Sequence, residues 1–453
     1  MNNKDKDFKN IVNHLKETGF VFQGSAIYGG LANTWDYGPL GTLITKNIKD
    51  LWWKEFIFKE PNNVGLDSKI LMNPKVWEAS GHIGNFSDPL IENKTNGRRY
   101  RADHIIEELD STLNSETMSK EEMQDWIKNN VKKYDGEKTN WTDIREFHLM
   151  FETHQGVLVD SKSKVYLRPE TAQGIFVNFS NVQRTSRLKV PFGIGQIGKS
   201  FRNEVTPGNF TFRTREFEQM ELEYFVKPGE DDSAFEYYIN KVKDFTNKIG
   251  LKKDSMKLRV HDKDELAHYS KGTTDIEFQF PFGWGELLGV SNRTDFDLKA
   301  HASLSGQKLE YRDPITNEVY TPYVIEPSIG MDRLTLAVLV DAYEVEQLEN
   351  DSRIVLKLDK VLAPYMFAIL PLNKKIHSSQ ARKTFAKLID MNISATYDES
   401  GSIGKRYRRQ DSIGTPFVLT IIDETATENK VTIRHRDSMN QETISLDNLH
   451  KYI

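Results

Sequence analysis

The sequence lacks cysteine, and that absence removes several classes of function at once. A chain of 453 residues without a thiol forms no disulfide, no thiolate-zinc site and no iron–sulfur cluster, and it has no cysteine nucleophile. Long apolar runs are missing too, since the densest, Leu334–Val340, contains Thr335 and is far too short to cross a bilayer. No basic-then-apolar signal segment opens the chain. These absences predict a cytoplasmic protein that contacts no membrane.

Charge of one sign does not dominate either, but charge is unevenly placed. The chain has 28% charged and 38% hydrophobic residues, which is typical of a globular protein with a substantial core. Residues 351–453 hold 16 basic and 12 acidic side chains, whereas residues 1–350 hold 45 basic and 54 acidic ones. A basic segment on an acidic body favours a polyanionic partner for that segment, although chance clustering on a solvated surface explains the counts more simply.

Hydrophobic periodicity indicates a mixed first region. Apolar residues at helical spacing from Leu40 to Phe56, directly after Pro39, predict a helix. Between Val165 and Val324, β-branched and aromatic runs alternate with Gly, Pro and Asn turns, as in an antiparallel sheet. An apolar helix over Met331–Tyr343 follows. The stretch 105–150, richest in Glu, Lys and Ser over Ile105–Lys138, is expected to be a charged helical insertion without a core.

The last hundred residues have a different pattern. Beyond the polar stretch Gln347–Ser352, which we interpret as a boundary, strand-like and helix-like segments alternate between residues 366 and 422. That alternation predicts a small α/β domain. The predicted fold class is therefore α+β, with an antiparallel-sheet domain flanked by helices over residues 1–350 and an α/β domain over 351–453.

Residues Gly193–Ser200 satisfy the phosphate-loop pattern G-x-x-x-x-G-K-[ST] and, over their first six positions, the dinucleotide pattern G-x-G-x-x-G. Both motifs need a helix whose N-terminus holds phosphates. Here turn and strand residues continue to Pro207 and leave no room for a helix. We interpret the glycines as positions where a strand passes close to its neighbours. A phosphate-loop NTPase and a nicotinamide dehydrogenase remain weaker alternatives.

Arginines, carboxylates and phenylalanines concentrate on two expected strands, Phe201–Glu204 and Phe212–Phe217, joined by a turn. Arginine forks suit phosphate oxygens and an aromatic ring suits a purine face. Alone, this pattern is explained more readily by an exposed, salt-bridged strand pair. Arg333 changes the balance, because it lies in the first turn of the helix after Gly330, where acids are normally preferred. An arginine there indicates a bound anion.

At these residues the chain resembles the class II aminoacyl-tRNA synthetases. The F-R-x-E strand–loop–strand is similar to their motif 2, and the G-x-x-R junction at Gly330–Arg333 is similar to their motif 3. Longer strings narrow the resemblance to glycyl-tRNA synthetases of the dimeric type; they are Phe22–Gly41, Tyr100–Asp103, Leu167–Gly174, Phe217–Glu221 and Asn292–Asp297. The resemblance runs from about Phe20 to the last residue. Motif 1, which carries the family's dimer interface, is placed loosely in Leu40–Gly81.

The resemblance implies a glycine–tRNA ligase that activates glycine with ATP to glycyl-adenylate plus pyrophosphate and then transfers glycine to the 3′ end of tRNA(Gly). It implies a cytoplasmic homodimer with a class II catalytic domain at 1–350 and an anticodon-binding domain at 351–453. Magnesium is expected to arrive with ATP. Ile91–Arg99 replaces the cysteine pair that related synthetases often carry, so no zinc and no other resident metal is expected. Because steric exclusion suffices for glycine, no editing domain is expected.

The ATP site is assigned by resemblance. Arg202 would hold the α-phosphate, while Arg333 would meet the γ-phosphate and cover the adenine opposite Phe212. Glu204 and Arg213 would contact base and phosphates, and Glu286 with Leu287 would line the ribose and magnesium side. The expected catalytic residues are Arg202, Arg333 and Glu286. The full ATP-binding set is Arg202, Asn203, Glu204, Phe212, Arg213, Thr214, Arg215, Glu216, Phe217, Glu286, Leu287, Gly330, Met331, Asp332 and Arg333.

Glycine offers only an ammonium and a carboxylate, so its site must be acidic and small. The resemblance assigns the ammonium to Glu170, Glu221, Glu326 and Ser328, and the carboxylate to Arg101. A single one of these glutamates would otherwise be interpreted as a surface carboxylate. The full glycine-binding set is Arg101, Glu170, Phe217, Glu218, Gln219, Met220, Glu221, Arg293, Glu326, Pro327, Ser328, Ile329 and Gly330.

The C-terminal region resembles an anticodon-binding domain. Four cations surround Tyr407, a combination that suits RNA phosphates and stacking on an unpaired base. The expected tRNA-binding residues are Lys405, Arg406, Arg408 and Arg409.

Two other functions stay open. A non-catalytic relative that binds nucleic acid would be expected to lose Arg202, Arg333 or the ammonium carboxylates, and this sequence keeps them. A synthetase for serine, threonine or proline is opposed by the strings around Glu221 and Glu326.

Overall fold

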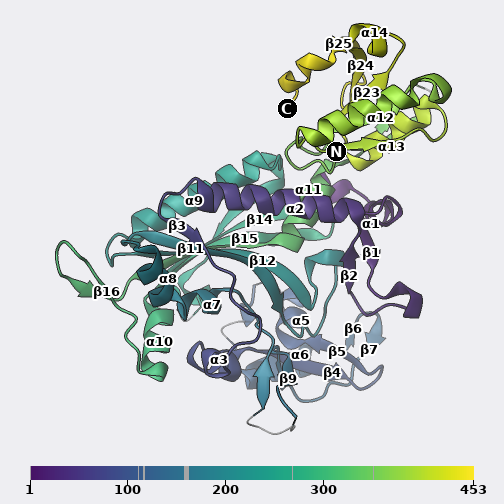
Figure 1. Ribbon diagram of the computed structural model, residues 1–453. Helices are drawn as coiled ribbons and strands as arrows, with labels where there is room; N and C mark the ends of the chain where they lie inside the picture. Colours follow the sequence, from purple (N-terminus) through teal and green to yellow (C-terminus); the bar gives the residue numbers. More distant parts are fainter. Residues whose placement is uncertain (1, 111, 116–117, 158–162, 268, 350) are drawn as a thin grey trace.

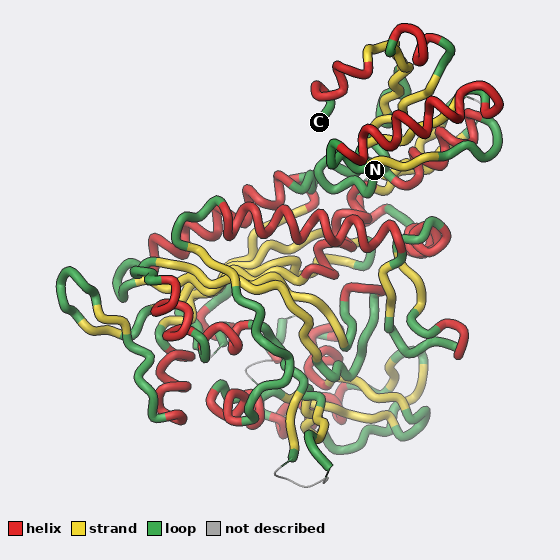
Figure 2. The backbone as a smooth tube through the Cα atoms, viewed as in Figure 1, coloured by secondary structure: helices red, strands yellow, loops and turns green. Residues whose placement is uncertain are grey.

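The computed structural model describes residues 2–110, 112–115, 118–157, 163–267, 269–349 and 351–453. A large body built of helices and strands carries a smaller unit that contains the C-terminus (Figures 1 and 2). The body has a mostly antiparallel sheet and the smaller unit a mixed one, so the α+β prediction is confirmed. None of the described helices has the length and apolar character needed to span a membrane.

A seven-stranded sheet forms the centre of the body. Its order is β13(Met256–Val260), β14(Gly272–Phe280), β15(Gly283–Thr294), β18(Tyr323–Gly330), β12(Glu216–Val226), β11(Phe192–Phe201) and β3(Asn63–Gly65). Every pair is antiparallel except β11 with β3. The strand predicted from Phe212 begins only at Glu216, because Phe210–Phe212 form a 3₁₀ turn.

The glycine-rich segment Gly193–Ser200 lies inside strand β11, which confirms that it is not a phosphate loop. A Cβ on Gly195 would lie 2.5 Å from Ile57 Cδ1, and one on Gly198 would collide with the Arg168 guanidinium. The glycines therefore accommodate neighbouring side chains rather than neighbouring backbone.

One face of the sheet packs against three helices, α2(Pro39–Trp53), α9(Asp231–Lys248) and α11(Met331–Ala342) (Figure 1). Helix α2 starts at Pro39 as predicted, and a π turn, Lys54–Phe58, continues it. Met220 and Leu222 of β12 point into this core. Their neighbours Glu221 and Glu223 therefore point to the other face, because successive strand residues alternate.

The opposite face is covered only in part, by α7(Ala172–Phe176), α8(Phe179–Ser186) and α10(Phe296–Ser305). These helices pack on Phe192, Ile194 and Phe225. Glu221 of β12 and Glu326 of β18 emerge on this same face and line the cavity described below.

The predicted charged insertion has a core of its own, so the prediction that it lacks one is wrong. Helices α5(Ala102–Leu109) and α6(Lys120–Asn130) pack on a sheet of β5(Arg98–Arg101), β4(Ser87–Asn93) and β8(Arg145–His148). Ile106 and Ile127 are fully buried there. The few apolar residues recur at helical spacing, and the surrounding charges hid that signal. Residues 111 and 116–117 of the insertion lie outside the described residues.

Short elements surround this framework. The remaining helices of the body are α1(Phe8–Glu17), α3(Lys75–Ala79) and α4(His82–Asn85). Four antiparallel ladders of two strands complete it: β1(Val21–Gln23) with β2(Trp35–Tyr37), β6(Lys133–Tyr134) with β7(Glu137–Lys138), β9(Glu152–His154) with β10(Lys164–Tyr166), and β16(Tyr311–Arg312) with β17(Val319–Tyr320).

The N-terminal segment is hydrogen-bonded to residues that lie late in the sequence of the body. Asn3 donates from Nδ2 to Asp341 Oδ1 (2.9 Å) and to Ser255 Oγ (3.0 Å). Lys6 donates from Nζ to the carbonyl of Val340 (2.6 Å). Asn3 and Lys6 are buried, so residues more than 330 positions apart complete one polar cluster.

The C-terminal unit is the predicted α/β domain. Its sheet has the order β22(Ala395–Tyr397), β21(Phe367–Pro371), β23(Phe417–Ile421), β24(Lys430–His435) and β25(Gln441–Ser445), with β21 parallel to both neighbours. Helix α12(Lys374–Asp390) packs on Phe367 and Ile369, whereas α13(Ile403–Ile413) packs on the alternate residues of β21. The two helices thus cover opposite faces. A short helix, α14(Glu424–Glu428), precedes β24.

The two ends of the polar stretch interpreted as a boundary, Gln347 and Ser352, belong to paired strands. Strands β19(Tyr343–Gln347) and β20(Ser352–Leu356) pair antiparallel across it. Arg353 of β20 reaches into the C-terminal unit, where its Nη1 lies 2.8 Å from Asp411 Oδ2. Asp411 also binds Arg434 (2.7 Å), while Arg353 binds Glu346 (2.6 Å). These four residues, hereafter the junction network, fasten the hairpin to helix α13 and strand β24.

Candidate active site

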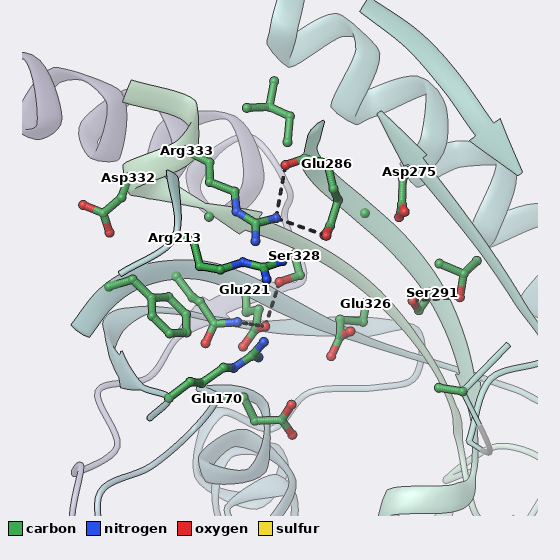
Figure 3. Close-up of a pocket in the computed structure, with 18 of the residues that line it drawn as sticks. Glu170, Arg213, Glu221, Asp275, Glu286, Ser291, Glu326, Ser328, Asp332 and Arg333 are labelled. Atoms are coloured by element: carbon green, nitrogen blue, oxygen red, sulfur yellow. Dashed lines mark hydrogen bonds and ion pairs between the residues drawn. The ribbon is translucent and has the colours of Figure 1, made fainter. Parts of the chain in front are cut away.

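A cavity of about 340 Å³ opens on the less covered face of the central sheet (Figure 3). Strands β12, β15 and β18, the connection between β11 and β12, and the segment 261–275 line it. Most predicted site residues meet here: Glu170, Arg202, Glu204, Phe212, Arg213, Thr214, Phe217, Glu218, Gln219, Glu221, Glu286, Leu287, Arg293, Glu326, Ser328, Gly330, Asp332 and Arg333.

Eight predicted residues do not line the cavity: Arg101, Asn203, Arg215, Glu216, Met220, Pro327, Ile329 and Met331. Met220, Ile329 and Met331 are buried in the core on the other face, as strand alternation and the start of α11 require. Glu216 pairs with Lys199 (3.1 Å). Arg101 is held by Asp88 (3.0 Å) and by Asp103. The structure therefore engages Arg101 with the carboxylates of Asp88 and Asp103, and Arg101 does not line the cavity.

One end of the cavity combines arginine with an aromatic ring. The Arg333 guanidinium carbon lies 4.5 Å from the centroid of Phe212, and its Nε donates to the Phe212 carbonyl (3.1 Å). Its Nη1 lies 3.1 Å from Glu286 Oε2. Glu286 is therefore the anion beside this arginine in the first turn of α11. A purine between two faces needs about 7 Å, twice the contact distance of about 3.5 Å. Arg333 must therefore move away from Phe212 to admit one.

Two further arginines face the same end. Arg202 donates from Nε to the carbonyl of Pro169 (3.1 Å) and packs between the rings of Phe86 and Phe217. It has no ion-pair partner in the part of the chain that the structure describes. Burial lowers the pKa of Arg213, against the opposing effect of Glu204. These cations are available for phosphate oxygens.

The other end is acidic and enclosed (Figure 3). Glu221 accepts from Gln219 Nε2 and Ser328 Oγ at 2.7 Å each, and from Thr171. Glu170 accepts from Gln173 Nε2 (2.7 Å). Arg293 is the cation at this end; it binds Glu326 (2.8 Å) but also Asp297 (2.8 Å), which neutralises it. The acidic end therefore holds a surplus of carboxylates.

That surplus shifts the titration of these groups. Burial raises the pKa of Glu326 to about 8, with Arg293 opposing and Glu221 and Glu170 adding to the rise. Burial and then Glu170 raise the pKa of Glu221. Burial alone would raise the pKa of Glu170, but His82, Arg293 and the Gln173 amide hold it below its usual range. A cation entering this end would relieve the mutual repulsion of the carboxyls.

Sequence reasoning missed one wall of the cavity. His261 and Asp275 pair there at 2.7 Å, and burial, followed by Glu286, raises the pKa of Asp275 to about 6. The Tyr269 ring lies 4.0 Å from the Arg293 guanidinium, and Ser291 stands opposite Glu326 in the ladder. Asp275 and Ser291 lie at inward positions of strands along which inward and outward residues alternate. That alternation could have identified them from the sequence. Residues 261–271 carry no such pattern.

The predicted RNA-binding cations lie in the first two turns of α13 and differ in exposure. Lys405 and Arg409 are exposed and Arg408 is half-buried, with Arg408 binding Asp351 (3.1 Å) and Arg409 binding Asp398. Arg406 is only 4% exposed and donates to the carbonyl of Pro371 (2.8 Å). The guanidinium carbon of Arg434 lies 4.9 Å from the centroid of the Tyr407 ring. Arg434 therefore occupies the ring on which an RNA base was expected to stack.

Comparison with known proteins agrees with this organisation. Residues 151–343 match the tRNA synthetase class II core domain of the G, H, P, S and T type, and residues 366–453 match the anticodon binding domain. A class II core followed by an anticodon-binding domain is the organisation of a class II tRNA synthetase.

Relatives that match over nearly the full length of the chain identify the family within the class II tRNA synthetases. The chain is 58% identical to the glycine–tRNA ligase of Mycoplasmopsis synoviae over 98% of both chains. It is 56% identical to that of Alkaliphilus metalliredigens, over 99% of this chain and 98% of the relative, and 55% identical to that of Mesoplasma florum over 98% of both. The chain belongs to the glycine–tRNA ligase family.

Proposed function

We propose that this protein is a glycine–tRNA ligase, which activates glycine with ATP and transfers it to the 3′ end of tRNA(Gly). The observation that carries the proposal is one cavity with an acidic, enclosed end next to an end rich in arginine. An ammonium fits the first end and a triphosphate the second.

The first step joins the two ends. A carboxylate oxygen of glycine attacks the α-phosphorus of ATP, and the bond to pyrophosphate breaks. Glu170, Glu221, Glu326 and Ser328 would hold the ammonium, while Arg202 would stabilise the charge that builds on the α-phosphate. Arg333, having left Phe212, would neutralise the departing pyrophosphate. Phosphoryl chemistry asks the protein mainly for this positioning and charge stabilisation.

The second step consumes the adenylate. A terminal ribose hydroxyl of tRNA attacks the glycyl carbonyl, the new ester forms, and AMP leaves. The cavity opening must therefore admit the 3′ end of an RNA. Lys405, Arg408 and Arg409 would contact RNA phosphates on the C-terminal unit, whereas Arg406 would support the strand end beneath them.

Magnesium would enter with ATP. It takes carboxylate and phosphate oxygens and keeps several waters. Glu286 and Asp275 are among the carboxylates that line the cavity, so the residues present fit such an ion. Within the described ranges, no three His, Asp or Glu residues gather as a metal site. We infer that zinc is not required, because Ile91–Arg99 replaces the cysteine pair that related synthetases often carry.

We further propose the domain division and assembly that the resemblance implies. Residues 1–350, with the insertion at about 105–150, would form the catalytic domain, and residues 351–453 would bind the anticodon. The β19–β20 hairpin spans this division. The protein would act as a homodimer in the cytoplasm, and sedimentation of the full chain at micromolar concentration would test the dimer.

The experiment that tests the function is ATP–pyrophosphate exchange with each of the twenty amino acids. Glycine alone should support exchange, and a zinc-selective chelator with magnesium in excess should leave it unchanged. Exchange with serine, threonine or proline instead would reassign the substrate. Exchange with none of them would favour a non-catalytic nucleic-acid-binding role.

A further inference from the structure

Glu223 is an unexplained buried acid beside the acidic end of the cavity. It is fully buried on β12, and no hydrogen-bond donor reaches either carboxylate oxygen within the described residues. An ionised carboxylate without partners in such a place is strongly destabilising. A buried acid of this kind calls for a role that the two reaction steps do not supply.

The strand register brings Glu223 to Glu326. Glu221 pairs with Ser328 and Tyr224 with Ile325, so Glu223 stands directly across from Glu326 in the β12–β18 ladder. Like charges opposite each other destabilise a sheet. A single proton between the two carboxyls removes that repulsion and satisfies both groups, as in other carboxyl pairs.

The surrounding charges favour the proton on Glu223. Glu221 lies on the same strand, Glu326 on β18 and Arg293 on β15, while Glu170, Tyr269 and Asp297 surround Arg293. Ile194, the partner of Glu223 on β11, is uncharged. Burial and then Glu326 raise the pKa of Glu223 well above its usual range. Arg293 is directly bonded to Glu326, not to Glu223.

We propose that Glu223 is a positioning residue of the glycine site, which keeps its proton and donates it to Glu326 in a hydrogen bond, so that Glu326 is held facing the ammonium of glycine. This inference rests on the proposed function. Glu223 itself does not line the cavity and does not touch the substrate. It acts only through Glu326, whose Oε2 is fixed on the other side by Arg293 (2.8 Å).

Two substitutions of similar volume separate a proton donor from a charge. Glu223→Gln keeps a neutral donor, so the KM for glycine and kcat in pyrophosphate exchange should stay within twofold of the wild type. Glu223→Leu removes the donor and should raise the KM for glycine about tenfold. The KM for ATP should stay within twofold in both variants, since the arginine end is untouched. The melting temperature of each variant reports whether it folds.

Three outcomes would overturn the inference. An unchanged KM for glycine in Glu223→Leu would remove the positioning role. An equal rise in Glu223→Gln and Glu223→Leu would show that Glu223 acts as an anion. If Glu223→Leu does not fold, the KM for glycine is measured from pH 6 to 9 in the wild type and in Glu223→Gln. Coincident pH profiles of the two proteins support a neutral Glu223. A profile of Glu223→Gln that is displaced along the pH axis overturns the inference. Wild-type exchange with glycine tests the proposed function separately.

Discussion

Two regions of this protein bury charged side chains. The buried charges are balanced by partners of opposite sign in one region and are unbalanced in the other. In the junction network, Arg353 and Asp411 are completely inaccessible, and each charge meets partners of opposite sign at 2.6–2.8 Å. In the acidic end of the cavity, Glu170, Glu221 and Glu326 share one arginine that Asp297 already neutralises. Balanced buried charge is what a structural joint needs. Unbalanced buried charge marks the place where the missing counter-charge arrives as a ligand.

The largest effect should come from unbalancing the junction. Asp411→Ala leaves Arg353 and Arg434 buried side by side, which should lower the free energy of unfolding by about 3–5 kcal/mol in a denaturant titration. The matched control is Glu428→Ala, which removes a carboxylate from the exposed pair with Lys430 and should cost about 0–1 kcal/mol. A loss below 1 kcal/mol for Asp411→Ala would mean that the junction does not depend on balanced charge.

An effect of comparable size is expected at the arginine-rich end of the cavity. There it concerns the reaction rate and not the stability of the fold. Arg202→Ala should slow single-turnover glycyl-adenylate formation at least a hundredfold, about 2.7–4 kcal/mol of transition-state stabilisation, while the protein stays folded. Arg215→Ala is the control, because Arg215 shares the motif but does not line the cavity, and it should change the rate less than threefold. Equal effects from both arginines would argue against a specific role for Arg202.

The unbalanced carboxylates should make glycine binding depend on pH. A proton on Glu326, whose pKa is about 8, competes with the glycine ammonium, so apparent affinity should rise roughly tenfold per pH unit from 6 toward 8. Because the folded pKa is raised, the stability that Glu326 contributes is complete below about 4.5 and is lost as pH rises through about 8.

Melting temperatures at pH 6 and 8.5, with and without glycine, measure both effects. Glycine should stabilise the protein more at pH 8.5 than at pH 6. In Glu326→Gln the contribution of this group to the pH dependence should disappear. Equal stabilisation at the two pH values in the wild type would contradict a titrating carboxyl in the site.

The smallest effect concerns the exposed charge of the C-terminal unit. Lys405→Ala should weaken tRNA(Gly) binding by less than about 1 kcal/mol and reduce the salt slope by about one, as expected for one phosphate contact. Lys383→Ala, on α12 and thus on the opposite face of the sheet, is the matched control and should leave binding unchanged. Identical losses from both variants would indicate non-specific attraction.

Comparison of the two regions also shows how far the sequence could be interpreted. Glu221, Glu326 and Arg333 lie in short contiguous strings that resemble synthetase motifs, so the resemblance alone could assign them to the glycine and ATP sites. The junction network joins Glu346, Arg353, Asp411 and Arg434 from four elements, and no local pattern connects them. The polar stretch at 347–352 was therefore interpreted as a boundary, although it joins two paired strands.

Burial was the other quantity that the sequence did not supply. Arg406 has the same chemistry as Arg408 and Arg409, but the helical turn points it at the carbonyl of Pro371. Glu223 lies two residues from Glu221 and was passed over, because only the register with β18 brings it to Glu326. Strand alternation placed both acids on one face, and the pairing of distant strands determined what each acid meets.

The docking of the N-terminal segment has a consequence for how the chain is made. Asn3 and Lys6 leave the ribosome well before their partners Asp341 and Val340, which are synthesised more than 330 residues later. At 5–20 residues per second, Asn3 and Lys6 wait roughly 20–70 s for their binding site to exist. Completion of the body is thus postponed until helix α11 has emerged. The first turn of that helix carries Arg333, so nascent chains acquire their ATP end only at the same late stage of translation.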